Sequence, residues 1–274
     1  MTFAVRSLAS GSNGNSVLVR AASGAVLVDA GLPLPRLEAA LQQAGQNPRD
    51  VRAICITHEH TDHSCGAAAF ASRYTVPLVC NAATYAALGA PDLPWRELPT
   101  GETLHLNTLD ITSFALPHDA VAPVGYRLEH AGGTVAIATD LGHWTDEIVA
   151  VLAGADLLLL EANHQRERLA NCGYPGHLQR RVRGKLGHLA NDQTAALLLA
   201  LHHRDPRPRT VWLAHLSARS NTPLLALAEV GAALAAARIS TIQLAVAPRG
   251  KPSSWWMYAP PLHQQSFWDA ELAL

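Results

Sequence analysis

The sequence predicts an α/β fold in which two mixed β-sheets pack together and helices cover both outer faces. Short apolar runs bounded by turn residues fill the first half of the chain, whereas apolar runs alternate with helical patterns in the second half. This order of elements is typical of two packed sheets with external helices. The 274 residues contain no repeat, low-complexity tract or long linker, so we expect a single domain over residues 1–274.

The first half of the chain is predicted to be mostly β. Its three opening strands are separated by turns rich in Gly, Ser and Asn and should form an antiparallel meander. A later pair closes as a hairpin over Gly132-Gly133. Helical apolar spacing predicts helices over residues 35–44 and around 67–74. The predicted strands span residues 3–8, 16–21, 25–29, 53–57, 78–81, 111–116, 124–129 and 134–138.

The second half is predicted to alternate helices with buried strands. A loop-rich basic segment, running to Gly187, should separate the first strand of this half from the next helix. Asn191 is the expected N-cap of that helix, and Thr222-Pro223 is an N-cap and N1 pair for the last one. The predicted helices span residues 145–153, 191–203 and 222–238, and the predicted strands span residues 156–160, 210–214 and 241–247.

Composition excludes several classes of protein. The longest uninterrupted apolar run has seven residues, 195–201, far short of a membrane span. The four cysteines form no Cys-x-x-Cys pair, which argues against a disulfide framework and a thiolate zinc site. The first residues lack a basic segment followed by a long apolar run, so we expect a cytoplasmic protein.

Charge is unevenly distributed along the chain. The net charge is −1, but residues 1–160 carry 8 basic against 15 acidic residues and residues 161–274 carry 13 against 7. The basic excess could line a cleft for an anionic substrate, with arginine gripping phosphate in a planar, two-pronged geometry. A genome rich in G and C enriches arginine over lysine without any functional meaning, and this explanation stays open.

A dense group of metal-ligand residue types follows the strand predicted at residues 53–57. The chain has 14 histidines, about twice the usual number for this length, and His58-Glu59-His60-Thr61-Asp62-His63 concentrates three of them. Alternate side chains of an extended loop lie on one side, so His58 and His60 can share one ion while Asp62 and His63 face a neighbouring one. Mixed imidazole and carboxylate ligands suit Zn, Mn or Fe.

Further ligand-type residues follow three other apolar runs. His118 comes after Phe114-Ala115-Leu116-Pro117, Asp140 after Ala136-Ile137-Ala138-Thr139, and His215 after Val211-Trp212-Leu213-Ala214. Each residue alone would be an ordinary turn residue. Together they supply the additional ligands that a site for two metals needs.

These motifs resemble, in order and spacing, the five motifs of the metallo-β-lactamase superfamily, with Asp29 in Leu27-Val28-Asp29-Ala30-Gly31 as the first. The resemblance implies a four-layer αβ/βα sandwich and two divalent transition metal ions, Mn or Zn. It implies that one ion is held by His58, His60 and His118, the other by Asp62, His63 and His215, and that Asp140 bridges them. Asp29 would accept hydrogen bonds that hold the loop, although it could also be a simple strand-end cap.

Other segments resemble the WalJ/YycJ (VicX) family of 5′-to-3′ DNA exonucleases. They are the Ser7-to-Ser16 opening, Leu160-Glu161-Ala162-Asn163-His164, Gly187-His188-Leu189-Ala190-Asn191-Asp192 and Ala214-His215-Leu216-Ser217, with Ala190 where the family is expected to have serine. The resemblance implies hydrolysis of nucleic acid, most specifically DNA with a free 5′ end, by metal-activated hydroxide. Asp62, Asp140 and His188 are the expected catalytic residues. His188 resembles the histidine of the tRNA-processing branch that helps to protonate the leaving oxygen, although it could instead contact the phosphate or be a structural histidine.

Several residues are candidates for contacts around that site. The loop with Ser10, Ser12, Asn13 and Asn15 could wrap a phosphate, although a plain turn explains it equally well. The basic residues Arg180, Arg181, Arg183 and Lys185 could bind the phosphate backbone or form a solvated face. Glu161 and His164 could orient the site or cap a strand end. Packing explains Trp255-Trp256 better than stacking on bases does.

Two other functions stay open. A hydrolase of the same fold could act on a small ester, lactone, thioester or cyclic phosphodiester, because the fold does not select among these substrates. A non-catalytic metal-binding regulator is the second alternative, but it has no need of a complete ligand set. The sequence does not determine the oligomeric state.

Overall fold

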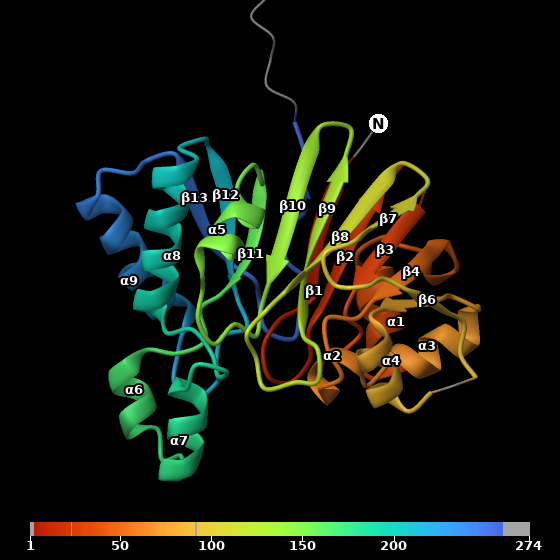
Figure 1. The fold of residues 1–274 in the computed structure, drawn as a ribbon, viewed down its shortest axis with the longest axis horizontal. Helices are drawn as coiled ribbons and strands as arrows, with labels where there is room; N and C mark the ends of the chain where they lie inside the picture. Colours follow the sequence, from red (N-terminus) through yellow and green to blue (C-terminus); the bar gives the residue numbers. More distant parts are fainter. Residues whose placement is uncertain (1–2, 23, 91, 260–274) are drawn as a thin grey trace, which may run out of the picture.

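Two seven-stranded mixed sheets form the centre of the molecule in the computed structural model, which describes residues 3–22, 24–90 and 92–259 (Figure 1). The first sheet has the order β14-β1-β2-β3-β4-β5-β6 and the second β13-β12-β11-β10-β9-β8-β7. The strands of the first sheet are β1 Ala4–Ala9, β2 Ser16–Ala21, β3 Gly24–Val28, β4 Val51–Cys55, β5 Leu78–Cys80, β6 Trp95–Glu97 and β14 Trp256–Met257. Those of the second are β7 Thr103–Leu106, β8 Leu109–Ala115, β9 Val124–His130, β10 Gly133–Ala138, β11 Leu157–Glu161, β12 Arg209–Ala214 and β13 Ile242–Val246.

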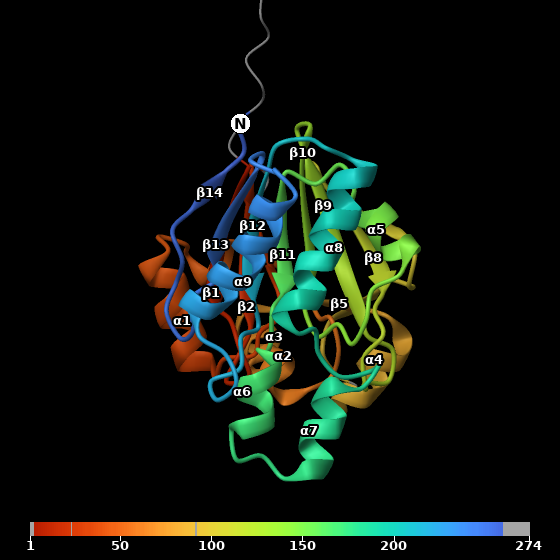
Figure 2. The same ribbon diagram turned by 90° about the vertical axis from the view of Figure 1, so that its left-hand side faces the viewer.

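Helices cover the outer face of each sheet and make four layers (Figure 1). Helices α1, α3 and α4 pack on the first sheet, and α5, α8 and α9 pack on the second. Helices α6 and α7 project beyond the sheets at the end where α2 lies (Figure 2). The helices are α1 Leu34–Gln43, α2 Thr61–Ser64, α3 Ala67–Tyr74, α4 Ala82–Leu88, α5 Asp146–Leu152, α6 Arg166–Asn171, α7 Gly176–Arg183, α8 Asn191–Arg204 and α9 Pro223–Ala236, with a 3-10 turn at Pro48–Asp50.

Three apolar layers hold this sandwich together. The middle layer lies between the two sheets and includes the fully buried side chains of Val5 and Tyr126. The outer layers lie under the helices, with Phe70 on one side and Leu198 on the other. Removal of apolar surface from water is the main stabilising contribution here. No helix within the described part of the chain is long and apolar enough to cross a membrane.

Strand direction brings the predicted site residues to one edge of the sandwich. Strands β3 and β4 run parallel in the first sheet, and β10, β11 and β12 run parallel in the second. Strand β8 is separated from β10 by the antiparallel β9 and therefore runs in the same direction as β10. The carboxyl ends of all six strands meet at this edge, the usual location of a site in α/β folds.

The predicted fold class is confirmed, and so are the opening meander, the hairpin of β9 with β10, and the Thr222 cap, whose side chain accepts the amide proton of Leu225. The predicted cap of α8 is wrong. Ala190 occupies the N-cap position without a side-chain acceptor, and the Gln193 side chain accepts the Ala190 amide proton instead. Asn191 begins the helix, and its buried amide donates to Glu229 of α9.

The prediction of a loop-rich segment before Gly187 is also wrong, because α6 and α7 lie there. Helix α7 has no fully buried residue, and its two apolar side chains, Leu178 and Val182, are too few to show a helical periodicity in the sequence. Short elements at the sheet margins were missed for a similar reason, since they bury few side chains. They are α4, β6, β7 and β14.

A partly buried ion pair at the end of α8, between Arg209 and Asp205, offers a test of stability. The side chain of Arg209 has no solvent exposure, and its Nη2 lies 2.9 Å from Asp205 Oδ2, which also accepts the Gly154 amide proton. Burial raises the pKa of Asp205, but the Gly154 amide and Arg209 outweigh this effect and hold the pKa below its usual value. We expect Asp205→Ala to lower the free energy of unfolding by about 3 kcal/mol at pH 7.

The penalty should shrink as the pH falls below about 4, because protonation removes the same interaction from the native protein. Urea unfolding of both proteins at pH 7 and at lower pH measures this difference. Arg207→Ala is the matched control, because Arg207 contacts the same carboxylate from an exposed position and should contribute less than about 1 kcal/mol. An equal loss for the two variants would contradict the prediction.

Candidate metal centre

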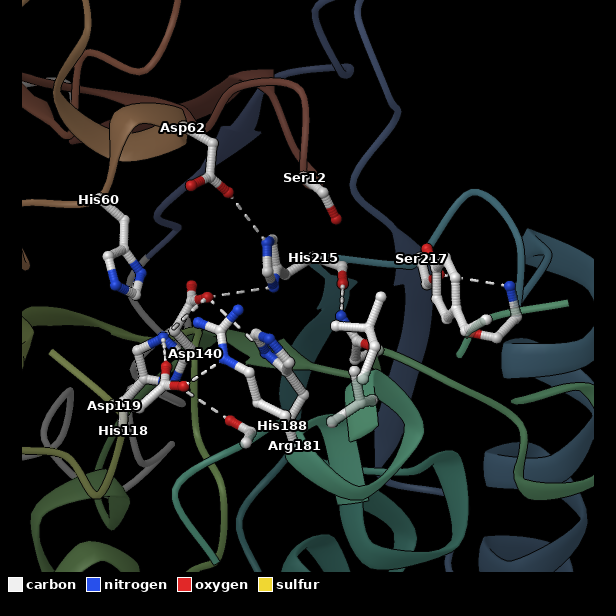
Figure 3. A pocket seen from close by; sticks show the side chains of 16 residues that line it. Ser12, His60, Asp62, His118, Asp119, Asp140, Arg181, His188, His215 and Ser217 are labelled. Carbon is white, nitrogen blue, oxygen red and sulfur yellow. Dashed lines mark hydrogen bonds and ion pairs between the residues drawn. The ribbon is translucent and has the colours of Figure 1, made fainter. Parts of the chain in front are cut away.

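A polar cavity of about 260 Å³ lies at the edge where the strands end (Figure 3). The loop around α2 borders it from the first sheet, and helix α7 borders it from the other side. Five of the seven predicted metal ligands line it, whereas His58 and His63 are buried beneath it. The five are His60, Asp62, His118, Asp140 and His215.

The first predicted ligand group is assembled from two sheets. His58 and His60 follow β4, His118 follows β8, and one nitrogen of each lies within 4.8 Å of the others. The His118 Nδ1 atom donates to the Gly187 carbonyl at 3.1 Å, which leaves its Nε2 for the site. His58 Nε2 and His118 Nε2 are buried without a hydrogen-bond partner among the described residues. Buried imidazole nitrogens in this state are suited to a metal ion.

The second predicted group consists of Asp62, His63 and His215, whose ligand atoms also lie within 4.8 Å of one another. His215 Nε2 lies 3.5 Å from Asp62 Oδ2 and has no hydrogen-bond partner among the described residues. Asp140 lies between the two groups. Its Oδ2 is 3.0 Å from His63 Nε2 and its Oδ1 is 3.8 Å from His118 Nε2. The donor set and its orphaned nitrogens fit two ions that share Asp140.

Asp29 holds the loop that carries four of the predicted ligands, residues 58–63. Its carboxylate accepts hydrogen bonds from the Thr57 amide and hydroxyl, and His63 Nδ1 donates to its Oδ2 at 2.7 Å. Because His63 Nδ1 is bound to Asp29, its Nε2 faces Asp140. The backbone at Asp62 can approach the segment after β3 because residue 31 is glycine, and a Cβ there would lie 1.7 Å from the Asp62 carbonyl oxygen. Asp29 therefore stands behind the ligand group and orients it.

Three strand-end residues of the site have strained backbone. Asp29, Asp140 and His215 adopt φ angles of 63°, 60° and 54°, in the left-handed region that non-glycine residues rarely adopt. Such conformations cost of order 1–3 kcal/mol each and persist where surrounding contacts enforce them. Their coincidence at the carboxyl ends of β3, β10 and β12 is typical of a functional site.

Glu161 connects two histidines of the site, His188 and His215. Its fully buried carboxylate binds the Nδ1 atoms of His188 and His215, both at 2.8 Å. It also accepts the amide protons of Leu141 and Leu189. Four donors saturate the carboxylate, so Glu161 orients the two rings and is not free to bind an ion, although it lies close enough to the ligand cluster.

Burial and neighbouring charges together set the protonation states of the site residues. Burial lowers the pKa of His58, so its imidazole is neutral at pH 7. Burial opposes ionisation of Asp140 and Glu161, but neighbouring imidazoles hold the pKa of Asp140 well below its usual value and lower that of Glu161 to about 2. Burial also disfavours protonated His215, yet Asp140 and the adjacent carboxylates raise its pKa to about 10. Bound ions would therefore displace protons from this cluster.

The predicted phosphate loop divides into two parts. Ser12 lines the cavity, and Asn13 is exposed outside it. Ser10 and Asn15 lie behind the ligands. The Ser10 hydroxyl accepts the His215 amide proton, and the Asn15 amide donates to the Asp62 carbonyl. These two residues support the predicted ligands and are not part of the cavity lining, where a substrate contact was expected.

The predicted basic residues at the end of α7 and just after it differ in their position relative to the cavity. Arg181 lines the cavity, whereas Arg180, Arg183 and Lys185 lie outside its lining. Arg183 is engaged by Gln179 of its own helix at 2.8 Å. One of the four predicted basic residues, Arg181, therefore lies at the site, and the other three lie around it.

His164 was expected to orient the site together with Glu161 or to cap a strand end. The His164 ring is buried and makes no hydrogen bond to Glu161 or to other described residues, so it does not orient the site through such a bond. Burial lowers its pKa to about 4.

Trp256 packs edge-to-face on Phe3, and Arg20 lies 4.4 Å from the ring centre of Trp255. Both tryptophans pack against the molecule outside the cavity lining, as the packing interpretation predicts.

Several residues of the cavity wall were not singled out from the sequence. Asp119, Tyr174, Ser217 and Ser220 line the cavity. Asp119 directly follows a predicted ligand, and Ser217 stands inside the motif Ala214-His215-Leu216-Ser217, so the available signal was their position in or beside the motifs. Tyr174 lies between α6 and α7, where no sequence pattern predicted structure.

Comparison with known proteins identifies the family. A model described as the β-lactamase superfamily domain matches residues 25–216. Exodeoxyribonuclease WalJ of Streptococcus pneumoniae serotype 2 is 36% identical over 227 residues, which cover 80% of this chain and 83% of that protein. Exodeoxyribonuclease YycJ of Bacillus anthracis is 34% identical over 232 residues, covering 83% of this chain and 87% of that protein.

Solved structures agree on the fold. The metallo-β-lactamase fold protein YhfI from Bacillus subtilis aligns with a TM-score of 0.72 over 94% of this chain and 100% of its own, at 14% identity. Zn²⁺-bound PqqB from Methylobacterium extorquens aligns with a TM-score of 0.68 over 92% of this chain and 99% of its own, at 18% identity. The chain therefore belongs to the metallo-β-lactamase superfamily and, within it, to the family of the WalJ and YycJ proteins.

Proposed function

We propose that this chain is a DNA exonuclease that hydrolyses phosphodiester bonds from a free 5′ end and uses two divalent transition metal ions, Mn or Zn. The observation that carries the proposal is the cavity, which joins two groups of imidazole and carboxylate donors to the guanidinium of Arg181. The names of the WalJ and YycJ relatives support DNA as the substrate. The 5′-to-3′ direction is the one implied by the sequence resemblance.

In this proposal His58, His60 and His118 hold one ion, the other is held by Asp62, His63 and His215, and Asp140 is shared. Two divalent ions supply Lewis acidity and an activated water at neutral pH. Arg181 neutralises charge on the phosphate. His188 has its Nδ1 bound to Glu161, which leaves Nε2 to deliver a proton to the leaving oxygen.

End-labelled nucleic acids test the proposed function. The purified, Mn-loaded protein is incubated with single- and double-stranded DNA and RNA labelled at the 5′ or the 3′ end. We expect 5′-labelled DNA to release labelled mononucleotide first, while 3′-labelled DNA shortens progressively. Preference for RNA, or release from the 3′ end first, would contradict the substrate or the direction. Turnover of lactones or thioesters without any nuclease activity would favour the small-molecule hydrolase.

We predict two metal ions per chain, and loss of both metal and activity in Asp140→Ala, because Asp140 lies between the two ligand groups. Elemental analysis after reconstitution with Mn or Zn measures the stoichiometry. His105→Ala is the control, since His105 is an exposed histidine paired with Asp110. A wild-type protein that holds one ion or none would refute the binuclear site.

We predict that His188→Ala keeps both metals while turnover of DNA falls by about 10² to 10⁴, the usual contribution of general acid catalysis. A nitrophenyl phosphodiester has a good leaving group that needs no proton, so the variant should lose much less activity on it. Single-turnover rates on both substrates measure the two effects. Equal losses would exclude proton donation and leave phosphate positioning, whereas metal loss would make His188 a ligand.

We predict that DNA binding weakens as salt rises, because the basic residues of α7 would release condensed counterions. Replacement of Arg180, Arg181 and Arg183 together by glutamine should reduce the salt slope by about 2 on single-stranded DNA. Fluorescence anisotropy at several salt concentrations measures the slope. An unchanged slope in the triple variant would remove α7 from the interface.

A further inference from the structure

Asp119 joins the metal-ligand loop to helix α7. Its Oδ2 accepts a hydrogen bond from Arg181 Nε at 2.5 Å, and its Oδ1 lies 3.3 Å from His118 Nε2. That Oδ1 atom is buried and has no hydrogen-bond partner among the described residues. The carboxylate thus stands between a predicted metal ligand and the cationic side chain that lines the cavity (Figure 3).

The backbone around this contact is well anchored. The Asp119 amide donates to the Leu186 carbonyl at 3.0 Å, and the neighbouring His118 ring donates to the Gly187 carbonyl at 3.1 Å. The His188 amide donates to the Val182 carbonyl at 2.9 Å, which ties the segment after α7 back to the helix. Arg181 therefore extends from a helix whose end is fixed against the ligand loop.

A guanidinium has two edges that can each grip an oxyanion. Asp119 occupies the Nε atom of Arg181, and no hydrogen bond or ion pair to Nη1 or Nη2 is made by the residues that the structure describes. Figure 3 shows this side chain reaching over the cavity beside Asp140 and His188. The free edge matches the two non-bridging oxygens of a phosphodiester.

We propose that Asp119 is a positioning residue that holds Arg181 by its Nε atom and presents the Nη1–Nη2 edge to the phosphate being cleaved beside the metal ligands. The proposal rests on the proposed phosphodiester function. Asp119 belongs to none of the donor groups within metal-binding distance, and one of its oxygens is engaged by Arg181. This arrangement indicates a tether and not an eighth ligand.

Lysine could not fill this role. An ammonium is a point charge on a flexible stem, so it cannot contact Asp119 and bind a phosphate through two parallel hydrogen bonds in one geometry. The other basic residues of α7 lack this arrangement as well, because the cavity lining includes neither Arg180 nor Arg183. The pair of Asp119 and Arg181 is therefore specific to the cavity.

The test compares metal-loaded wild type with Arg181→Gln, Arg181→Lys, Asp119→Asn and the double variant Asp119→Asn/Arg181→Gln. Isothermal titration calorimetry gives the Kd of inorganic phosphate, and steady-state assays give kcat and KM for bis(p-nitrophenyl) phosphate. Elemental analysis gives the metal content. Asp192→Asn is the matched control, because Asp192 accepts from Arg166 Nε at 2.9 Å in an exposed pair outside the cavity lining.

We expect Arg181→Gln to raise the Kd and the KM by about 10- to 100-fold, the range for hydrogen bonds to charged groups, while kcat falls by less. Arg181→Lys should resemble it. Asp119→Asn should raise both constants at least about threefold with full metal content, and it should add nothing in the double variant. Asp192→Asn should match wild type.

Loss of metal from Asp119→Asn would overturn the proposal and make Asp119 a ligand. An equal effect of Asp119→Asn with and without Arg181 would also overturn it, because the two residues would then act independently. These outcomes differ from failure of the nuclease function. Phosphate binding that depends on both residues in a protein that digests no DNA would uphold the tether, whereas DNA digestion with phosphate affinity unchanged in every variant would reject it.

Discussion

The carboxylate of Glu161 is withdrawn completely from water at the end of β11, and the centre is arranged around it. An unpaired buried carboxylate would cost several kcal/mol, so its four donors are a requirement of the fold. Two of those donors are the amides of Leu141 and Leu189, the residues that follow Asp140 and His188. The other two are the rings of His188 and His215. One carboxylate therefore sets the positions of three residues of the proposed chemistry.

The fold class and the predicted metal ligands could be inferred from the sequence because both follow from strong local patterns. Apolar runs mark strands that are buried on both faces, and in this fold the polar residue after such a run lies at the edge where strand ends meet. His118, Asp140 and His215 were found in this way, and the structure brings them next to the loop that contains His58. The binding of ions by these residues stays a prediction.

The parts that sequence reasoning missed depend on contacts between distant segments. Helix α7 has only two apolar side chains, Leu178 and Val182, which is too few for a recognisable periodic pattern, so the helix was missed and with it the Arg181 contact to Asp119. Ser10 and Asn15 belong to a loop whose composition suits phosphate binding equally well, and the packing of that loop against Asp62 and His215 turns them inward. Glu161 was singled out as a residue that could orient the site, but the residues it orients could not be named from the sequence, because its four donors come from separate segments.

The location of the centre has a consequence for the cohesion of the molecule. His58, His60, Asp62 and His63 come from the first sheet, whereas His118, Asp140 and His215 come from the second. Each proposed ion would therefore join the two sheets across their shared edge. By thermodynamic linkage, an ion present at about 1,000 times its dissociation constant adds roughly 4 kcal/mol to the stability of the folded state. Depletion of metal would then weaken the contact between the two sheets and lower the stability of the folded protein, in addition to removing the proposed activity.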